Sequence, residues 1–114
     1  MRILICEDDP IHSMNLEMIF EDGGHQVVGI YGRADLAILH CWRDAPDLAV
    51  VDLRLADGHT GLAMVRTLDK LGIPSIIVSA EAEFLTEPTA ARSVIAKPYH
   101  ERQLLDALDE ACAA

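Results

Sequence analysis

The stretch ILICEDDP, residues 3–10, passes from four apolar residues into three adjacent carboxylates and then a proline. The apolar part belongs to a run, residues 2–6, that is typical of a strand covered on both faces of a parallel sheet. Asp9 and Pro10 suit the N-cap and the first position of a helix. The stretch therefore predicts a buried strand with an acidic end, followed directly by a helix.

Short apolar runs and longer amphipathic segments alternate along the rest of the chain. Four further runs predict strands, at residues 26–31, 48–52, 75–79 and 93–96. The segments between them predict crossover helices, and repeated strand–helix units form a parallel sheet with helices on both faces. We therefore expect an α/β fold of the doubly wound, flavodoxin-like type, with five parallel strands, in one domain of residues 1–114.

The apolar pattern that predicts a helix is clearer in the first helical segment than in the second. Four apolar residues share one face of the first helix, and we expect this face to be buried: Ile11, Met14, Met18 and Ile19. The second helix, residues 34–43, has a weaker apolar pattern. We interpret Trp42, near its end, as a packing residue.

For the later helices, glycine and proline residues predict where the helices end. The third helix carries apolar residues between 62 and 71 and ends before Gly72 and Pro74, and the last lies within residues 104–111. Between the strands that end at 79 and 96, Pro88 leaves room for only a turn or two of helix. We therefore predict a shortened fourth helix.

Composition limits the classes of function. Of the 114 residues, 51% are hydrophobic, which is enough for a core, and the formal net charge of −10 argues against binding nucleic acid. Without an apolar stretch of roughly 20 residues, no contact with a membrane is expected. The first residues lack the pattern of a signal peptide, and three cysteines without metal-ligand spacing fit neither a disulfide framework nor a zinc site. We predict a cytoplasmic protein.

Polar residues follow the predicted strands where ligands collect in a parallel sheet, at the carboxyl ends. They are Glu7, Asp8, Asp52, Ser79 and Lys97. Two carboxylates about 4 Å apart repel by about 4 kcal/mol at an effective dielectric constant of about 20. Three of them therefore need a cation or a bound proton. Oxygen ligands without histidine or thiolate favour a hard cation, and Mg²⁺ is the usual one.

A carboxylate beside a metal ion suggests phosphoryl chemistry. Asp52 is a candidate nucleophile that would form an acyl phosphate, with Mg²⁺ offsetting the crowded negative charge. Lys97 would place a compact positive charge on a second phosphoryl oxygen. Ser79 would donate a hydrogen bond to a third, and the small Ala80 leaves an entry path.

In these residues the chain resembles the receiver domain of two-component response regulators, similar to the chemotaxis regulators. Four motifs carry the resemblance in order: CEDD (6–9), VVDLRLADG (50–58), IIVSA (76–80) and AKP (96–98). Each is weak alone, but together they span essentially the whole chain. The segment DLRLADGHTG, with one extra residue, is similar to a subgroup found in bacterial general-stress signalling.

The resemblance implies a strand order of 2-1-3-4-5 and phosphotransfer to Asp52 from a histidine kinase or a phosphotransfer protein. It implies that Asp8, Asp52 and the backbone carbonyl of Arg54 bind Mg²⁺ directly and that Glu7 binds it mostly through water. It also implies a cis peptide bond between Lys97 and Pro98. A receiver promotes its own phosphorylation and dephosphorylation but is not a turnover enzyme.

Three features depart from the common receiver pattern. Val94 stands where the usual switch aromatic would lie, three residues before Lys97. The shortened fourth helix changes the surface that most receivers use for output. Arg54 borders the phosphoryl position, and we hypothesise an ion pair with Glu81 that tunes the access of water.

Several functions stay open. The leading hypothesis is a stand-alone receiver whose output is a protein–protein contact, although a longer chain would let the domain regulate an attached effector. A Mg²⁺-dependent phosphohydrolase with an aspartyl nucleophile is an alternative, but CEDDP lacks the D-x-D spacing of such enzymes. A pseudo-receiver that docks partners without phosphorylation is a third. The sequence does not name the kinase, the output partner, the phosphate lifetime or the oligomeric state.

Overall fold

The computed structural model describes residues 1–112 and contains a central sheet of five parallel strands in the order β2-β1-β3-β4-β5. The strands are β1 (Arg2–Cys6), β2 (Gln26–Tyr31), β3 (Leu48–Val51), β4 (Ser75–Ser79) and β5 (Ser93–Ala96). The helices are α1 (Pro10–Asp22), α2 (Ala34–Arg43), α3 (Gly61–Lys70) and α4 (Glu101–Cys112). The predicted fold class and strand order are confirmed.

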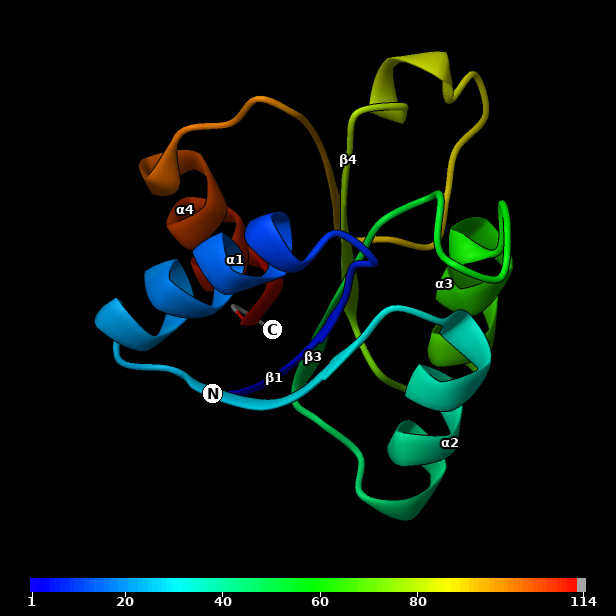
Figure 1. Ribbon diagram of the computed structural model, residues 1–114, viewed down its shortest axis with the longest axis horizontal. Helices are drawn as coiled ribbons and strands as arrows, with labels where there is room; N and C mark the ends of the chain where they lie inside the picture. Colours follow the sequence, from blue (N-terminus) through cyan, green and yellow to red (C-terminus); the bar gives the residue numbers. More distant parts are fainter. Residues whose placement is uncertain (113–114) are drawn as a thin grey trace.

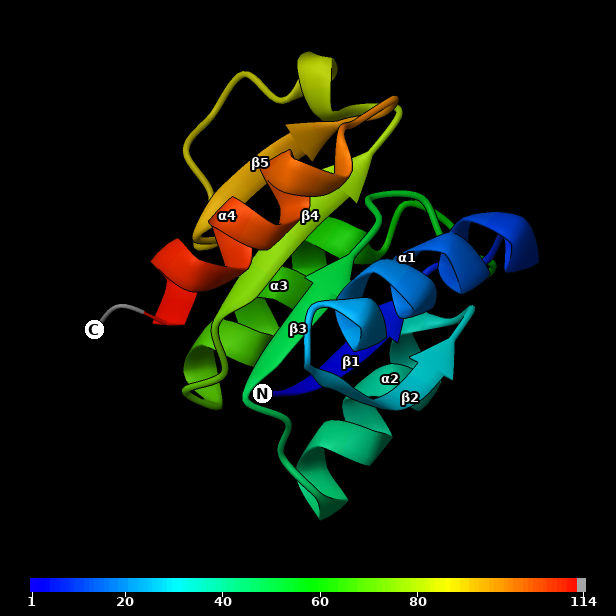
Figure 2. The ribbon, with the colours of Figure 1, turned by 90° about the vertical axis from the view of Figure 1, so that its left-hand side faces the viewer.

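Helices cover both faces of the sheet, as Figures 1 and 2 show. Helices α1 and α4 lie on one face, and α2 and α3 lie on the other. Successive residues of a strand point to opposite faces, so Ile3 and Ile5 of β1 pack under α1 and α4, whereas Leu4 and Cys6 pack under α2 and α3. This two-sided burial explains why the strands read as continuous apolar runs.

The buried face of α1 differs from the predicted one. Its buried residues are Ser13, Leu16, Ile19 and Phe20, whereas three of the four residues expected in the core, Ile11, Met14 and Met18, are exposed. The prediction was wrong because α1 has apolar residues around most of its circumference, and periodicity alone does not tell which face meets the sheet. Trp42 on α2 is also exposed, contrary to our interpretation of it as a packing residue.

The connections between strands and helices agree more closely with the sequence. Asp9 caps α1, since its Oδ1 accepts a hydrogen bond from the Ile11 amide at 2.9 Å, and Pro10 is the first helical residue. The fourth helix is reduced to a single 3₁₀ turn, η1 (Ala82–Phe84). The Lys97–Pro98 peptide bond is cis, as the resemblance implied.

The loop between β3 and α3 is fastened to the start of α2. Asp57 accepts hydrogen bonds from the amides of Ala34 and Asp35 at 3.1 and 3.3 Å and from the Thr60 hydroxyl at 2.9 Å. Within residues 1–112, none of the helices has the length and apolar character that crossing a membrane requires.

Candidate functional site

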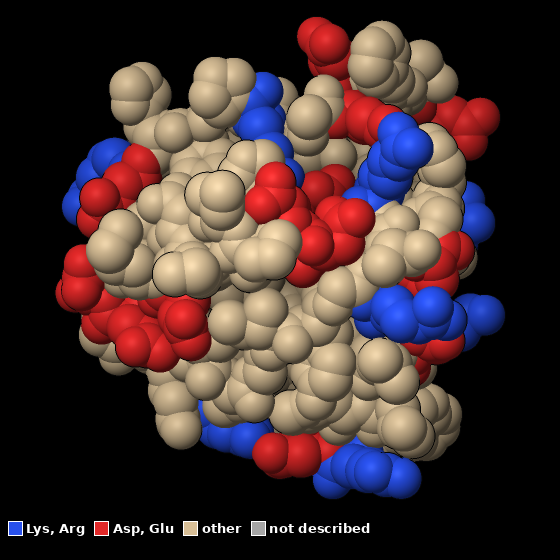
Figure 3. Space-filling model, viewed as in Figure 1, with Lys and Arg blue, Asp and Glu red and all other residues tan. Residues whose placement is uncertain are grey.

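The predicted site residues meet in one hollow at the carboxyl edge of the sheet. A cavity of about 280 Å³ is lined by Glu7, Asp8, Asp9, His12, Asp52, Arg54, Ser79, Ala80, Glu81 and Lys97. Strands β1, β3, β4 and β5 bring them together, because each contributes its last residues or those just beyond. Figure 3 shows Asp and Glu gathered near the middle of this side of the molecule, with Lys and Arg at the margins.

Lys97 holds the centre of the site. Its Nζ donates to Oδ2 of Asp52 at 2.9 Å and to Oε1 and Oε2 of Glu7 at 3.1 and 3.2 Å. The two carboxylates are nearly inaccessible, with exposed fractions of 4% for Glu7 and 7% for Asp52. The lysine therefore neutralises one of two buried acids, and a second unit of positive charge is still required for balance.

A proton on Glu7 would supply this second charge. Burial, assisted by the hydrogen bond to Asp52 and by the charge of that residue, raises the pKa of Glu7 to about 8. Burial also acts to raise the pKa of Asp52, but hydrogen bonds with Glu7, Ser79 and Lys97 outweigh it and hold that pKa below its ordinary value. Asp52 is therefore ionised at neutral pH, as a nucleophile must be.

Backbone amides orient the remaining oxygens around Asp52. Its Oδ1 accepts a hydrogen bond from the Arg54 amide at 3.2 Å. Ser79 Oγ accepts one from the Glu81 amide at 3.1 Å, so its hydroxyl hydrogen is available for the hydrogen bond to Asp52. Ser79 is itself buried at the end of β4.

The donor set suits a hard cation, although it is not assembled as a metal site. Within residues 1–112, no group of three His, Cys, Asp or Glu side chains is gathered closely enough to hold a metal ion. Lys97 instead lies between Glu7 and Asp52, while Asp8 lines the cavity from an exposed position. Burial and the charge of Asp52 raise the pKa of Glu7, as expected where negative charge is crowded, and the oxygens of the cluster are of the type that Mg²⁺ prefers.

The mouth of the cavity carries a loose group of charged side chains. Arg54 Nη1 lies 3.9 Å from Oε1 of Glu81, and Nδ1 of His59 lies 3.6 Å from its Oε2. The hypothesised Arg54–Glu81 contact is therefore present, at the long end of the range for an ion pair. Arg54 is mostly exposed, so the contact contributes little to stability.

His12 is a site residue that sequence reasoning missed. Its Nδ1 lies 3.2 Å from Lys97 Nζ and 3.4 Å from Oε1 of Glu7. An imidazole nitrogen that faces an ammonium group must accept a hydrogen bond, so this contact favours the tautomer with the proton on Nε2. The sequence feature that could have pointed to His12 is its position in the first turn of α1, three residues after the N-cap Asp9.

Comparison with known proteins gives the same picture. Residues 3–109 match the family model of the response regulator receiver domain. The chain is 38% identical over 102 residues to the phyllosphere-induced regulator PhyR of Methylorubrum extorquens, covering 86% of this chain and 38% of PhyR. It is 26% identical over 111 residues to the transcriptional regulatory protein PhoP of Escherichia coli, covering 92% of this chain and 49% of PhoP. The chain thus spans less than half the length of these relatives.

Solved structures agree in fold. The receiver domain of PhyR from Erythrobacter litoralis superimposes with a TM-score of 0.87 at 29% identity, covering 96% of this chain and 88% of that domain. PhyR from Brucella abortus superimposes with a TM-score of 0.86 at 31% identity, and the match covers 96% of this chain and 46% of the PhyR chain. With a buried aspartate, a lysine and a hydroxyl converging at the carboxyl edge of the sheet, the chain belongs to the receiver domain family of two-component response regulators.

Proposed function

We propose that this receiver accepts a phosphoryl group on Asp52 from a histidine kinase or a phosphotransfer protein and is not a turnover enzyme. The observation that carries the proposal is the convergence of Asp52, Lys97 and Ser79 in one hollow, with Asp52 ionised and held by defined hydrogen bonds. Membership of the receiver family supports it.

The transfer exchanges one covalent bond for another. A carboxylate oxygen of Asp52 attacks the phosphorus of a phosphohistidine, the P–O bond forms, and the P–N bond breaks with its electron pair going to the imidazole, which then takes up a proton. The product carries more negative charge than the carboxylate did. Lys97, already 2.9 Å from Oδ2, is placed to hold this charge, and the Ser79 hydroxyl, which now bonds to Asp52, would bond a phosphoryl oxygen instead.

The acidic residues are the proposed metal ligands. Asp8, Asp52 and the backbone carbonyl of Arg54 would hold Mg²⁺ directly, and Glu7 mostly through water. When bound, the ion neutralises charge on the carboxylate and the phosphoryl oxygens. The side chains of Glu7 and Lys97 would have to move to make room for the ion, because they are now hydrogen-bonded to each other.

We expect the affinity for Mg²⁺ to depend on pH through Glu7. With the pKa of Glu7 raised to about 8, binding at lower pH must displace its proton, so affinity should rise as pH increases from 6 to 9, by up to about tenfold per pH unit below that pKa. Isothermal titration in buffers of different ionisation enthalpy would measure both the affinity and the released proton. Glu7→Gln should flatten the profile, whereas His12→Gln should leave it. If His12→Gln flattened the pH dependence of Mg²⁺ affinity and Glu7→Gln did not, the assignment of this dependence to Glu7 would be wrong.

Output is proposed to be a protein–protein contact made in the cytoplasm. One solved relative, PhyR of Bartonella quintana, is an anti-anti-sigma factor, which supports an output through protein binding in this subgroup. Val94 is partly exposed on β5, and the neighbouring segment holds only the η1 turn. We infer that phosphorylation draws the loops that carry Ser79 and Lys97 inward and changes the surface around residues 80–94.

The proposal is tested by incubating the protein with Mg²⁺ and a small phosphodonor such as acetyl phosphate and recording the intact mass. A gain of one phosphoryl group that is labile to hydroxylamine supports an acyl phosphate on a receiver. Turnover of the donor without an adduct would favour a phosphohydrolase. Neither adduct nor turnover would favour a pseudo-receiver.

We expect Arg54→Ala to shorten the lifetime of the phosphorylated form. The side chain stands at the mouth of the cavity beside Glu81, so its removal opens a path for water. A loss about fivefold faster is the scale expected, since about 1 kcal/mol in the barrier corresponds to about fivefold in rate. The decay of the phosphorylated mass after the donor is removed measures it. Arg66→Ala, an exposed arginine on α3, is the matched control, and equal lifetimes for both variants would remove the tuning role.

A further inference from the structure

The outer face of α2 carries an apolar row that the fold leaves uncovered. Leu36, Leu39 and Trp42 are 48%, 45% and 69% exposed, although all three are large apolar residues. They are spaced three residues apart, so they form one stripe along the helix. The buried side of α2 is a different set, Ala34, Ala37 and Cys41.

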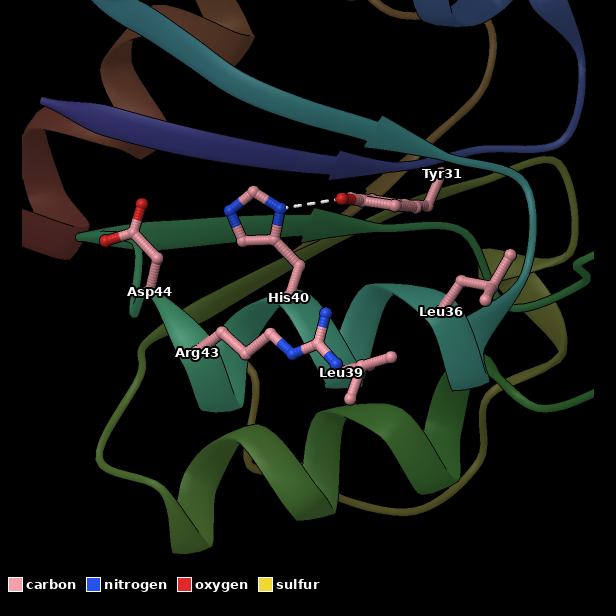
Figure 4. A pocket seen from close by; sticks show the side chains of 6 residues that line it. All are labelled: Tyr31, Leu36, Leu39, His40, Arg43 and Asp44. Atoms are coloured by element: carbon pink, nitrogen blue, oxygen red, sulfur yellow. Dashed lines mark hydrogen bonds between the residues drawn. The ribbon is translucent and has the colours of Figure 1, made fainter.

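A shallow cavity of about 280 Å³ adjoins this stripe, between α2 and β2. Figure 4 shows its lining, with Leu36, Leu39 and Arg43 along α2 and Tyr31 behind them on β2. The Tyr31 hydroxyl and Nδ1 of His40 are 2.7 Å apart and hold the back wall together. The outer face of α2 therefore has an exposed Trp42 and a hollow that is lined in part by Leu36 and Leu39.

The exposed residues of α2 are arranged symmetrically about Leu39. Leu36 and Trp42 lie three residues to either side of it, and Asp35 and Arg43 lie four to either side. If two copies of α2 pack antiparallel about a two-fold axis at Leu39, each Trp42 lies level with the second copy's Leu36, beside the hollow. Each Asp35 lies level with the second copy's Arg43, about 6 Å along the helix from the axis. Acidic residues then face basic ones at both ends of the contact.

Charge selects this face over the other exposed apolar stripe. The chain carries a net charge of −10, so two copies repel each other over most of their surfaces. On α1 the exposed Met14 and Met18 are accompanied by Glu17, Glu21 and Asp22, with no lysine or arginine in the helix. Around α2, by contrast, the acidic and basic residues are equal in number: Arg33, Asp35, Arg43 and Asp44. Figure 3 shows acidic residues massed at the end of α1 and both signs mixed near α2.

The β2 edge of the sheet, which adjoins α2, is a poorer place for self-association. Strand β2 is an edge strand, but its pairing with β1 shifts register between Ile3 and Leu4, which leaves Val28 out of the ladder. Such a bulge twists an edge and disfavours its extension by a further strand.

We propose that two copies of this chain associate through the outer faces of their α2 helices, packed antiparallel about Leu39. The helix has ten residues and is about 15 Å long, so the contact falls in the small, weak class of interfaces. It lies on the face of the sheet opposite α1 and does not include a residue of the phosphoacceptor site.

Sedimentation velocity over a range of concentrations up to the millimolar tests the proposal. The wild type should shift from monomer towards dimer as its concentration rises. Leu39→Glu places two carboxylates against each other at the two-fold axis and should weaken association by at least about tenfold. Met14→Glu, an equally drastic change on the exposed stripe of α1, should leave it unchanged. A wild type that stays monomeric throughout, or loss of the dimer in Met14→Glu rather than Leu39→Glu, would overturn the proposal.

A charge exchange tests the antiparallel pairing itself. Arg43→Glu and Asp35→Lys should each weaken self-association, because like charges then meet at both ends of the contact. A mixture of the two variants should associate again, since every introduced glutamate would face an introduced lysine of the other chain. Circular dichroism of each variant checks that α2 still forms, because Asp35 also binds Arg33. A mixture that associates no better than either variant alone would exclude this arrangement.

Discussion

Asp52→Asn is expected to abolish phosphorylation by a small phosphodonor while leaving the protein folded. The amide is nearly isosteric with the carboxylate, yet it is not a nucleophile towards phosphorus. It also lacks the negative charge that Lys97 binds at 2.9 Å. Intact mass after incubation with Mg²⁺ and acetyl phosphate should show one added phosphoryl group on the wild type and none on the variant.

The matched control is Asp9→Asn, which changes another acid that lines the same cavity. Asparagine is as good an N-cap as aspartate, so α1 should start unchanged and phosphorylation should persist. The pKa of Glu7 provides a second readout, because it responds to the negative charge of Asp52. The charge of Asp52 helps to raise the pKa of Glu7, so that pKa should fall in Asp52→Asn. Phosphorylation of the Asp52→Asn variant at the wild-type rate would show that the acceptor is another residue.

Gly61→Ala is expected to cause the largest loss of stability of any single-methyl change near the site. A Cβ at Gly61 would lie 2.0 Å from the backbone oxygen of Asp52 and 2.6 Å from the Cα of Leu53. Both are backbone atoms that cannot rotate away, so the β3–α3 connection must shift. The cost is about 3 kcal/mol, at the upper end for overpacking. This exceeds the gain of about 1 kcal/mol that alanine brings to a helix.

Urea denaturation of both proteins measures this loss directly. Gly32→Ala is the control, because a Cβ there meets Asp8 at an ordinary 3.5 Å and the free energy of unfolding should change by less than about 1 kcal/mol. The clash at Gly61 involves the carbonyl of Asp52, the proposed phosphoacceptor, so slower phosphorylation should accompany the loss of stability. Equal stability of the two alanine variants would mean that the connection yields without strain.

Most of the fold was predictable because its signals are local. Each strand is a short apolar run bounded by polar or turn residues, and four of the five begin and end as predicted; only the strand at 48–52 is one residue shorter. The gathering of Asp52, Ser79 and Lys97 was predictable as well, since parallel strands bring their carboxyl ends to one edge. Their roles in phosphoryl transfer stay predictions.

The features that sequence reasoning missed depend on contacts between distant segments. Nothing local tells that the sheet selects Leu16 and Phe20 of α1 rather than Met14 and Met18. The contact of His12 with Lys97 joins residues 85 positions apart, so it depends on how α1 packs beside the segment after β5. The capping of α2 by Asp57 is of the same kind, because the two segments are 23 positions apart in the chain.

The hydrogen bonds between Asp57 and the first turn of α2 link the loop after Asp52 to the helix that follows the edge strand β2. Residues 53–60 follow Asp52 directly, so a displacement of that loop pulls on the amides of Ala34 and Asp35. Any shift of this loop would therefore be passed to α2, on the face of the sheet opposite α1 and α4.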